Sequence, residues 1–245
     1  MELYSLPLAI EDFVPVIFSV LGFYFIARMI TAMDTRYSKM AYLGVLLLAI
    51  GGFLKAGWKL IYALTDGQTD IRVFDNSLFF FLSAAFILLT FSLWYAQRSK
   101  FAGRSPANPW LAPLVLVGLS VGTGLLMGVS VLDPEKEGRQ IWFFILLGVT
   151  TIFNFSVLIL AIRQAMKQKE WLPVFLLLVN MIAIIMLQGM ARAVTQTESI
   201  QWVEQITNSI AQGGLAFAAW RLYQHAKNPH AIWAAPADDP LLVQA

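Results

Sequence analysis

Seven apolar stretches alternate with short polar connections along the 245-residue chain. The stretches cover residues 13–33, 41–64, 75–97, 110–132, 140–163, 171–194 and 200–223. Each is long enough to cross ~30 Å of hydrocarbon as a helix rising 1.5 Å per residue. Backbone groups in lipid must be hydrogen-bonded internally, so each stretch is predicted to be helical. The pattern predicts an all-α integral membrane protein with a bundle of seven transmembrane helices over residues 1–227.

Composition supports this class and narrows the function. Hydrophobic residues make up 58% of the chain and charged residues 13%, whereas soluble domains carry about a quarter charged residues. A net charge of +2 gives no indication of a nucleic-acid partner. Cysteine is absent and both histidines lie near the C-terminus. We therefore expect no cofactor, and an intramembrane enzyme is the least favoured class.

Lysine and arginine are concentrated in alternate connections. One set of ends carries Arg36, Lys39, Arg98, Lys100, Arg104, Arg163, Lys167, Lys169, Arg221 and Lys227. The opposite ends carry Asp66, Asp70, Asp75, Asp133, Glu135, Glu137 and Glu198, with Arg72, Lys136 and Arg139. The basic side is expected to be cytoplasmic, with the N-terminus outside and the C-terminus inside a plasma membrane, the inner membrane if the source is bacterial. Residues 228–245 are predicted to be a flexible cytoplasmic tail.

The fourth stretch carries no charge and has two pairs of small residues at four-residue spacing, Gly118 with Gly122 and Gly124 with Gly128. Such pairs allow close contact between helices. We expect this glycine face to be buried within the same chain, and a homo-oligomer contact is the alternative. Three stretches before and three after it are also compatible with a weak 3+1+3 repeat, an arrangement that some transporters use.

Two lysines interrupt the second stretch. Lys55 and Lys59 are four residues apart, so they lie on one side of a helix, and Gly51 on that side lets a neighbour approach. Lys55 lies ~18 Å from the cytoplasmic helix end, where an ammonium group must snorkel, deprotonate or pair. We predict that it points into the bundle and pairs with the seventh helix, with Glu204 as the first candidate. Lys59 is nearer the outer surface and is expected to snorkel.

The seventh stretch carries the longest polar stripe of the chain. Glu204, Asn208 and Gln212 recur at four-residue spacing and should face the bundle interior. On the sixth stretch, Gln188 and Arg192 lie one turn apart. These positions predict a site between the second, sixth and seventh helices. Its ligand-binding residues are predicted to be Lys55, Lys59, Gln188, Arg192, Glu204, Asn208 and Gln212.

The charge of this site depends on how its cations are paired. Asp66, Asp75 and Glu204 lie at a depth similar to that of the lysines, and Asp75 is also expected to cap the third helix. Full pairing would make the cluster structural, whereas an unpaired cation would suit a small anion. Asn154 and Asn180 lie near the middle of their helices, where each is expected either to join helices or to line a cavity.

Two classes of function follow from these features. The first is a protein that binds or transports a small polar or anionic solute through the predicted site. The alternative is a non-transporting seven-helix sensor module or an accessory subunit of a larger membrane complex. A water-filled pathway with two openings would favour the carrier, and a sealed bundle with a large apolar outer face would favour the subunit.

Overall fold

The structure is a computed structural model that describes residues 5–131, 141–193 and 197–228, with side chains described at 5–126, 141–190 and 197–228. All regular structure in these ranges is helical, as predicted. The elements are α1 (Leu6–Glu11), α2 (Phe13–Met33), the 3-10 turn η1 (Thr35–Tyr37), α3 (Ser38–Leu64), α4 (Arg72–Ala102), α5 (Leu111–Val131), α6 (Ile141–Lys167), α7 (Trp171–Ala193) and α8 (Glu198–Lys227). Each of the seven apolar stretches corresponds to one long helix, and α1 is an additional short helix.

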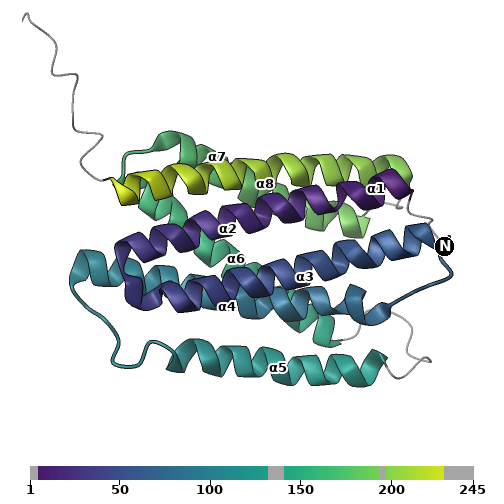
Figure 1. Cartoon of the computed structure of the whole chain (residues 1–245), viewed down its shortest axis with the longest axis horizontal. Coiled ribbons are helices and arrows are strands. Elements are labelled where there is room, and N and C mark those ends of the chain that lie inside the picture. Colours follow the sequence, from purple (N-terminus) through teal and green to yellow (C-terminus); the bar gives the residue numbers. More distant parts are fainter. Residues whose placement is uncertain (1–4, 132–140, 194–196, 229–245) are drawn as a thin grey trace, which may run out of the picture.

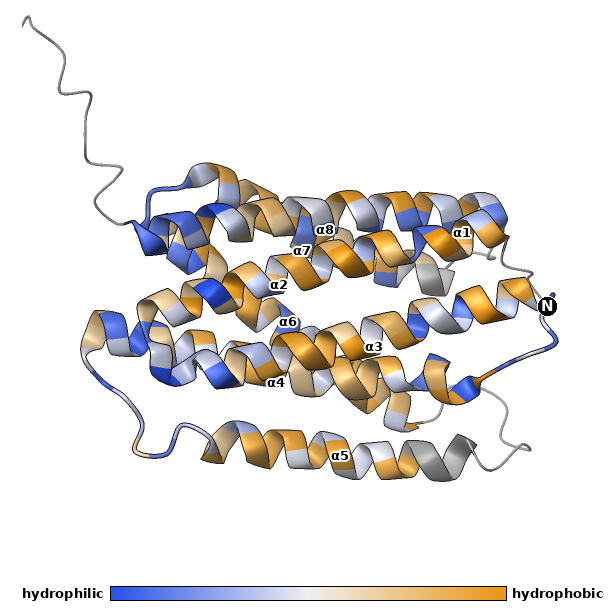
Figure 2. Ribbon diagram, in the orientation of Figure 1, coloured by the Kyte–Doolittle hydropathy of each residue, from blue (hydrophilic) through white to orange (hydrophobic). Residues whose placement is uncertain are grey.

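The long helices lie side by side and alternate in direction (Figure 1). The α2–α3, α4–α5 and α6–α7 connections lie at one end of the bundle, together with the end of α8. The α3–α4 connection and α1 lie at the opposite end. Hydrophobic residues dominate the middle of most helices, and hydrophilic residues gather toward the two ends (Figure 2). We call the first end the basic end, because Arg36, Lys100 and Lys167 belong to it.

The helices have the length and composition of a helical membrane protein. Within the described residues, five segments are long and apolar enough to cross a bilayer: Leu6–Met33, Thr35–Leu64, Arg72–Ala102, Ile141–Lys167 and Trp171–Met190. The described apolar part of α5, Leu111–Leu126, is shorter. The polar stripe of α8 explains why this helix does not qualify on hydropathy.

The apolar core lies in the half of the bundle next to the basic end. Buried side chains from α2, α4, α6 and α8 meet there, among them Phe23, Leu89, Leu158 and Leu215, each at most 2% exposed. The Phe23 and Phe86 rings meet edge to face with centroids 5.2 Å apart. This half is therefore closely packed.

Glycines bring α3 close to its neighbours. A Cβ atom added at Gly51 would lie 2.8 Å from Cβ of Phe81 on α4, and one at Gly44 would lie 2.9 Å from Cγ of Leu89. At Gly52 it would lie 2.9 Å from a methyl carbon of Val16 on α2. Larger residues would push these helices apart, so the glycines determine how closely α2 and α4 flank α3.

The glycine face of α5 is buried within the chain only in part. α5 packs on α4 and α6, and Gly124 faces the ring of Phe80 so closely that no Cβ would fit. A Cβ at Gly118 or Gly122 would meet nothing within 4 Å. The Gly118–Gly122 pair therefore lies on the open side of α5. Gly118 and Gly122 are four residues apart and share one side of the helix, whereas Gly124 is two residues beyond Gly122 and points to another side. The surroundings of Gly128 lie outside the residues whose side chains are described. The 3+1+3 repeat stays a prediction.

The corner between α2 and α3 is fixed by one carboxylate. Asp34 follows the last residue of α2 and forms an ion pair with Arg36, with 2.6 Å between Nη2 and Oδ2. The Ser99 hydroxyl of α4 donates to the same carboxylate at 2.7 Å. The Arg36 guanidinium, followed by the Ser99 hydroxyl, lowers the Asp34 pKa to about 2.

The predicted tail, apart from Asn228, lies outside the described residues, as do Asp133, Glu135, Lys136, Glu137 and Arg139.

Candidate functional site

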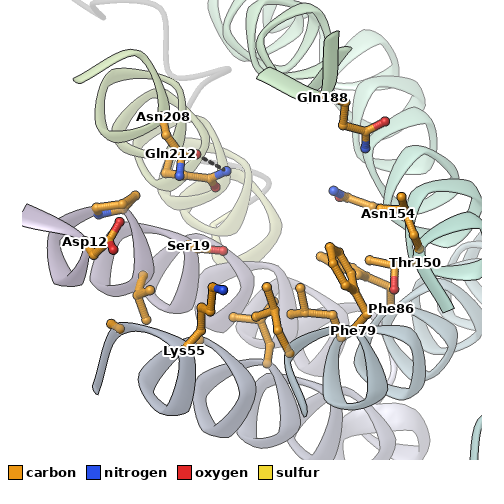
Figure 3. A pocket seen from close by; sticks show the side chains of 18 of the residues that line it. Asp12, Ser19, Lys55, Phe79, Phe86, Thr150, Asn154, Gln188, Asn208 and Gln212 are labelled. Carbon is orange, nitrogen blue, oxygen red and sulfur yellow. Dashed lines mark hydrogen bonds between the residues drawn. The ribbon is translucent and has the colours of Figure 1, made fainter. Parts of the chain in front are cut away.

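A cavity of about 370 Å³ lies between six helices, in the half of the bundle away from the basic end. Polar side chains reach it from α3, α6, α7, α8 and the start of α2, whereas α4 contributes only apolar side chains such as Phe79 and Phe86 (Figure 3). It is lined by Asp12, Pro15, Val16 and Ser19 at the start of α2, Leu48, Gly52, Lys55, Ala56 and Lys59 of α3, Leu78, Phe79, Leu82 and Phe86 of α4, Leu147, Thr150, Thr151 and Asn154 of α6, Gln188 of α7, and Gln205, Asn208 and Gln212 of α8. The site therefore extends beyond the three helices that the sequence indicated.

Lys55 and Lys59 of α3 both line the cavity, and each has a carboxylate partner. Lys55 contacts Asp75 of α4, and its Nζ lies 4.4 Å from the centroid of the Trp58 ring. Lys59 Nζ lies 2.5 Å from Oδ2 of Asp12, which joins α1 to α2. The Lys59–Asp12 pair is the more buried, with side-chain exposures of 14% and 9% against 29% and 34% for Lys55 and Asp75.

Two predictions about these charges are wrong, and Lys59 has a partner that the sequence did not predict. Lys55 pairs with Asp75 and not with Glu204, because α4 is the helix that approaches α3 at Gly51. Asp75 does not cap its helix: α4 begins at Arg72, so Asp75 falls in the first turn, where its carboxylate reaches Lys55. Lys59, which was expected to snorkel, contacts Asp12, because the short α1 segment brings this carboxylate against it.

The wall of the cavity formed by α6, α7 and α8 carries amides and hydroxyls as its polar groups. Gln188 of α7 donates to the Thr151 hydroxyl of α6 at 3.1 Å, and Gln212 donates to Asn208 one turn earlier on α8 at 3.4 Å. Figure 3 shows Gln188 and Asn154 facing Asn208 and Gln212 across the cavity. Such groups both donate and accept hydrogen bonds, so this wall can bind polar groups without requiring a charge.

Several polar atoms of this wall have unused hydrogen-bonding capacity. The Thr150 Oγ1, Gln205 Oε1 and Gln212 Oε1 atoms are shielded from solvent and have no hydrogen-bond partner among the described residues. Leaving a buried polar group unpaired costs ~1–3 kcal/mol. Three such atoms line this cavity, and each can accept a hydrogen bond from a polar molecule bound there.

Five of the seven predicted site residues line the cavity: Lys55, Lys59, Gln188, Asn208 and Gln212. Glu204 lies on α8 but is not a lining residue, and the side chain of Arg192 lies outside the described residues. Asn154 lines the cavity, whereas Asn180 is buried and donates to the Ala211 carbonyl at 3.0 Å, so it joins α7 to α8.

The sequence interpretation missed Asp12, Ser19, Thr150 and Thr151. Asp12 had a recognisable signal, because two adjacent carboxylates, Glu11 and Asp12, stand at the start of an apolar stretch. Both are used: Asp12 pairs with Lys59, and Glu11 accepts a hydrogen bond from Ser209 of α8 at 2.6 Å. The hydroxyl residues gave no comparable signal, since Ser and Thr are common in membrane helices and often bond to their own backbone.

The described residues contain no group of three His, Asp or Glu side chains that could hold a metal ion. Comparisons with protein-family models, with curated proteins and with solved structures find no match to this chain.

Proposed function

We propose that this chain is a seven-span plasma-membrane protein that binds a small polar solute without net charge in the cavity between α2, α3, α4, α6, α7 and α8. The observation that carries the proposal is the set of three shielded polar atoms, on Thr150, Gln205 and Gln212, that have no partner among the described residues. A volume of about 370 Å³ suits a small molecule, since ligand pockets start at ~300 Å³.

The absence of net charge follows from the ion pairs. An anion would be favoured if a cavity lysine lacked a counter-ion, but Lys55 and Lys59 each contact a carboxylate. The remaining polar lining residues are amides and hydroxyls. This lining therefore fits an uncharged solute, or a zwitterion whose charges exchange partners with one ion pair. It fits an anionic solute, which the lysines alone suggested, less well.

The orientation belongs to the same proposal. The lysine and arginine bias makes the basic end cytoplasmic. α8 can cross the bilayer because its polar residues Gln205, Asn208 and Gln212 face the cavity. The chain has no cysteine, so Lys100→Cys and Asp70→Cys variants can be labelled in intact cells with an impermeant thiol reagent. We expect labelling at 70 and none at 100; the reverse pattern would invert the orientation.

On the side nearer the basic end, the lining residue Phe86 packs against Phe23 of the buried core. A packed core on one side of the site is compatible with a receptor-like binding site and with one state of a carrier. A second candidate, an accessory subunit, is supported by the open side of α5, where Gly118 and Gly122 lie among exposed apolar residues. A partner helix, from another protein or a second copy, could pack there.

Thermal unfolding of the purified protein tests the binding proposal. The probes are a hexose, a neutral amino acid and a carboxylate anion. A solute present at 100 times its dissociation constant stabilises the folded state by ~2.7 kcal/mol. We expect stabilisation by an uncharged or zwitterionic probe, loss of the effect in Gln212→Leu, and no loss in Gln224→Leu, the same change at an exposed position of α8. Stabilisation by the anion alone, or an effect that survives Gln212→Leu, would contradict the proposal.

A further inference from the structure

A second polar cluster lies between α2 and α8 near the basic end. Arg28 of α2 donates from Nη1 to the Tyr24 hydroxyl at 2.9 Å and from Nη2 to the Tyr223 hydroxyl of α8 at 2.6 Å. Its Cζ lies 4.9 Å from the centroid of the Tyr223 ring. Arg28 is half-buried, and both sequence neighbours, Ala27 and Met29, are fully buried. We call these three side chains the Arg28 cluster.

The guanidinium of Arg28 has no carboxylate within 4.0 Å among the described residues. The nearby carboxylates are used elsewhere: Asp34 pairs with Arg36, and Glu170 pairs with Arg221 and contacts His225 at 3.3 Å. Arg221 and His225 are four residues apart and share one side of α8. Tyr223 lies midway between them in sequence and therefore on the opposite side, facing α2, so the Glu170 carboxylate is turned away from the Arg28 cluster.

The cluster contains hydrogen-bond donors and one positive charge but no anion. A phenol oxygen that accepts from arginine keeps its own O–H to donate, and neither the Tyr24 nor the Tyr223 hydroxyl donates to another described residue. The guanidinium has three further N–H groups that make no hydrogen bond to the part of the chain that is described. These donors belong to three side chains in direct contact and lack an acceptor among the described residues.

We propose that the Arg28 cluster binds a phosphate group. Arginine presents a planar set of donors that matches phosphate oxygens, and two phenol hydroxyls would complete the ligation. Arg28 lies five residues before the end of α2, ~7.5 Å along the helix, a depth that a lipid headgroup can reach. The phosphate can belong to an anionic lipid or to a soluble molecule, and this site is separate from the cavity that holds the lysines.

The test compares unfolding midpoints of the purified full chain during titration with short-chain phosphatidylglycerol, short-chain phosphatidylcholine and inorganic phosphate. The variants are Arg28→Gln and Tyr223→Phe. Arg98→Gln is the matched control, because Arg98 also lies near the basic end but packs on Trp94, with its Cζ 5.7 Å from the ring centroid. Losing one charge-assisted contact should weaken binding ~10-fold or more.

We expect saturable stabilisation by phosphatidylglycerol that weakens about 10-fold in Arg28→Gln and less in Tyr223→Phe, with no change in Arg98→Gln. Equal stabilisation by inorganic phosphate would identify a soluble phosphate as the ligand. If Arg28→Gln does not fold, Tyr223→Phe decides the question, since it keeps the charge and removes one donor. No saturable effect of either phosphate source, or an equal loss in Arg98→Gln, would overturn the proposal and leave Arg28 a structural link between α2 and α8.

Discussion

The pair between Lys59 and Asp12 gives the sharpest test of how charge is arranged in the bundle. The ions lie 2.5 Å apart with side-chain exposures of 14% and 9%. At an effective dielectric constant of ~20, unit charges at this distance attract by ~7 kcal/mol, and desolvation costs several kcal/mol for each ion. The pair as a whole therefore contributes little net stability, but each ion depends strongly on the other.

Removing one partner leaves the other charge buried. We expect Lys59→Met and Asp12→Asn each to lower the free energy of unfolding by ~3 kcal/mol, at the low end of the range for buried pairs because both side chains keep some exposure. The double variant should lose about as much as one single variant, since no isolated charge remains. The coupling energy would then be ~3 kcal/mol, at the upper end for residues in contact.

The assay is equilibrium unfolding in detergent micelles for the wild type, both single variants and the double variant. The Lys55–Asp75 pair is the internal comparison: its exposures of 29% and 34% predict smaller single losses and a coupling of ~1 kcal/mol. Additive losses at Lys59 and Asp12 would refute the reasoning. So would a larger coupling between Lys55 and Glu204 than between Lys55 and Asp75.

Three further predictions concern packing and pH. Gly51→Ala should destabilise the protein by ~1–3 kcal/mol because its Cβ meets Phe81, whereas Gly57→Ala, which meets nothing within 4 Å, should be neutral or stabilising; unfolding midpoints compare them directly. Gly124→Leu should destabilise the monomer through its contact with α4, and Gly122→Leu should leave the monomer's unfolding unchanged; equal losses would place the Gly122 side of α5 inside the chain. Asp34, whose pKa is lowered to about 2, should stabilise the folded state above pH 3.8, and this stabilisation should be lost as the pH falls toward 2. The free energies of unfolding of the wild type and of Asp34→Asn should therefore change differently with pH between about 3.8 and 2 and change in parallel above this window.

The helices were predictable because their signal is strong. Long apolar stretches in a membrane protein have no other stable backbone structure, so the number and approximate bounds of the long helices follow from hydropathy. The face of α3 was also predictable: Gly51 and Lys55 are one turn apart, and the inference that a neighbour approaches and meets the charge is correct. Five lining residues were found because polar groups in apolar helices are rare and must face inward.

The hydropathy pattern did not show which helices pack against each other. Lys55 had acidic candidates on more than one helix, and the choice of Asp75 over Glu204 depends on α4 packing against α3, a long-range contact with no sequence pattern of its own. Asp12 was missed because a carboxylate beside an apolar stretch usually lies in solvent. The Gly118–Gly122 part of the α5 glycine face was misassigned because small residues allow close packing without specifying on which side the partner lies.

The central claim, that the bundle holds a water-accessible polar cavity above a packed core, can be tested on one helix. Asn154 and Ala161 lie seven residues apart on the same side of α6; Asn154 lines the cavity and Ala161 is 0% exposed in the core. In this cysteine-free chain, the rates at which Asn154→Cys and Ala161→Cys react with a small water-soluble thiol reagent measure access at the two depths. We predict rapid modification at 154 that slows when the bound solute is present, and none at 161 in the folded protein. Equal rates at the two positions, or no reaction at 154, would contradict the cavity.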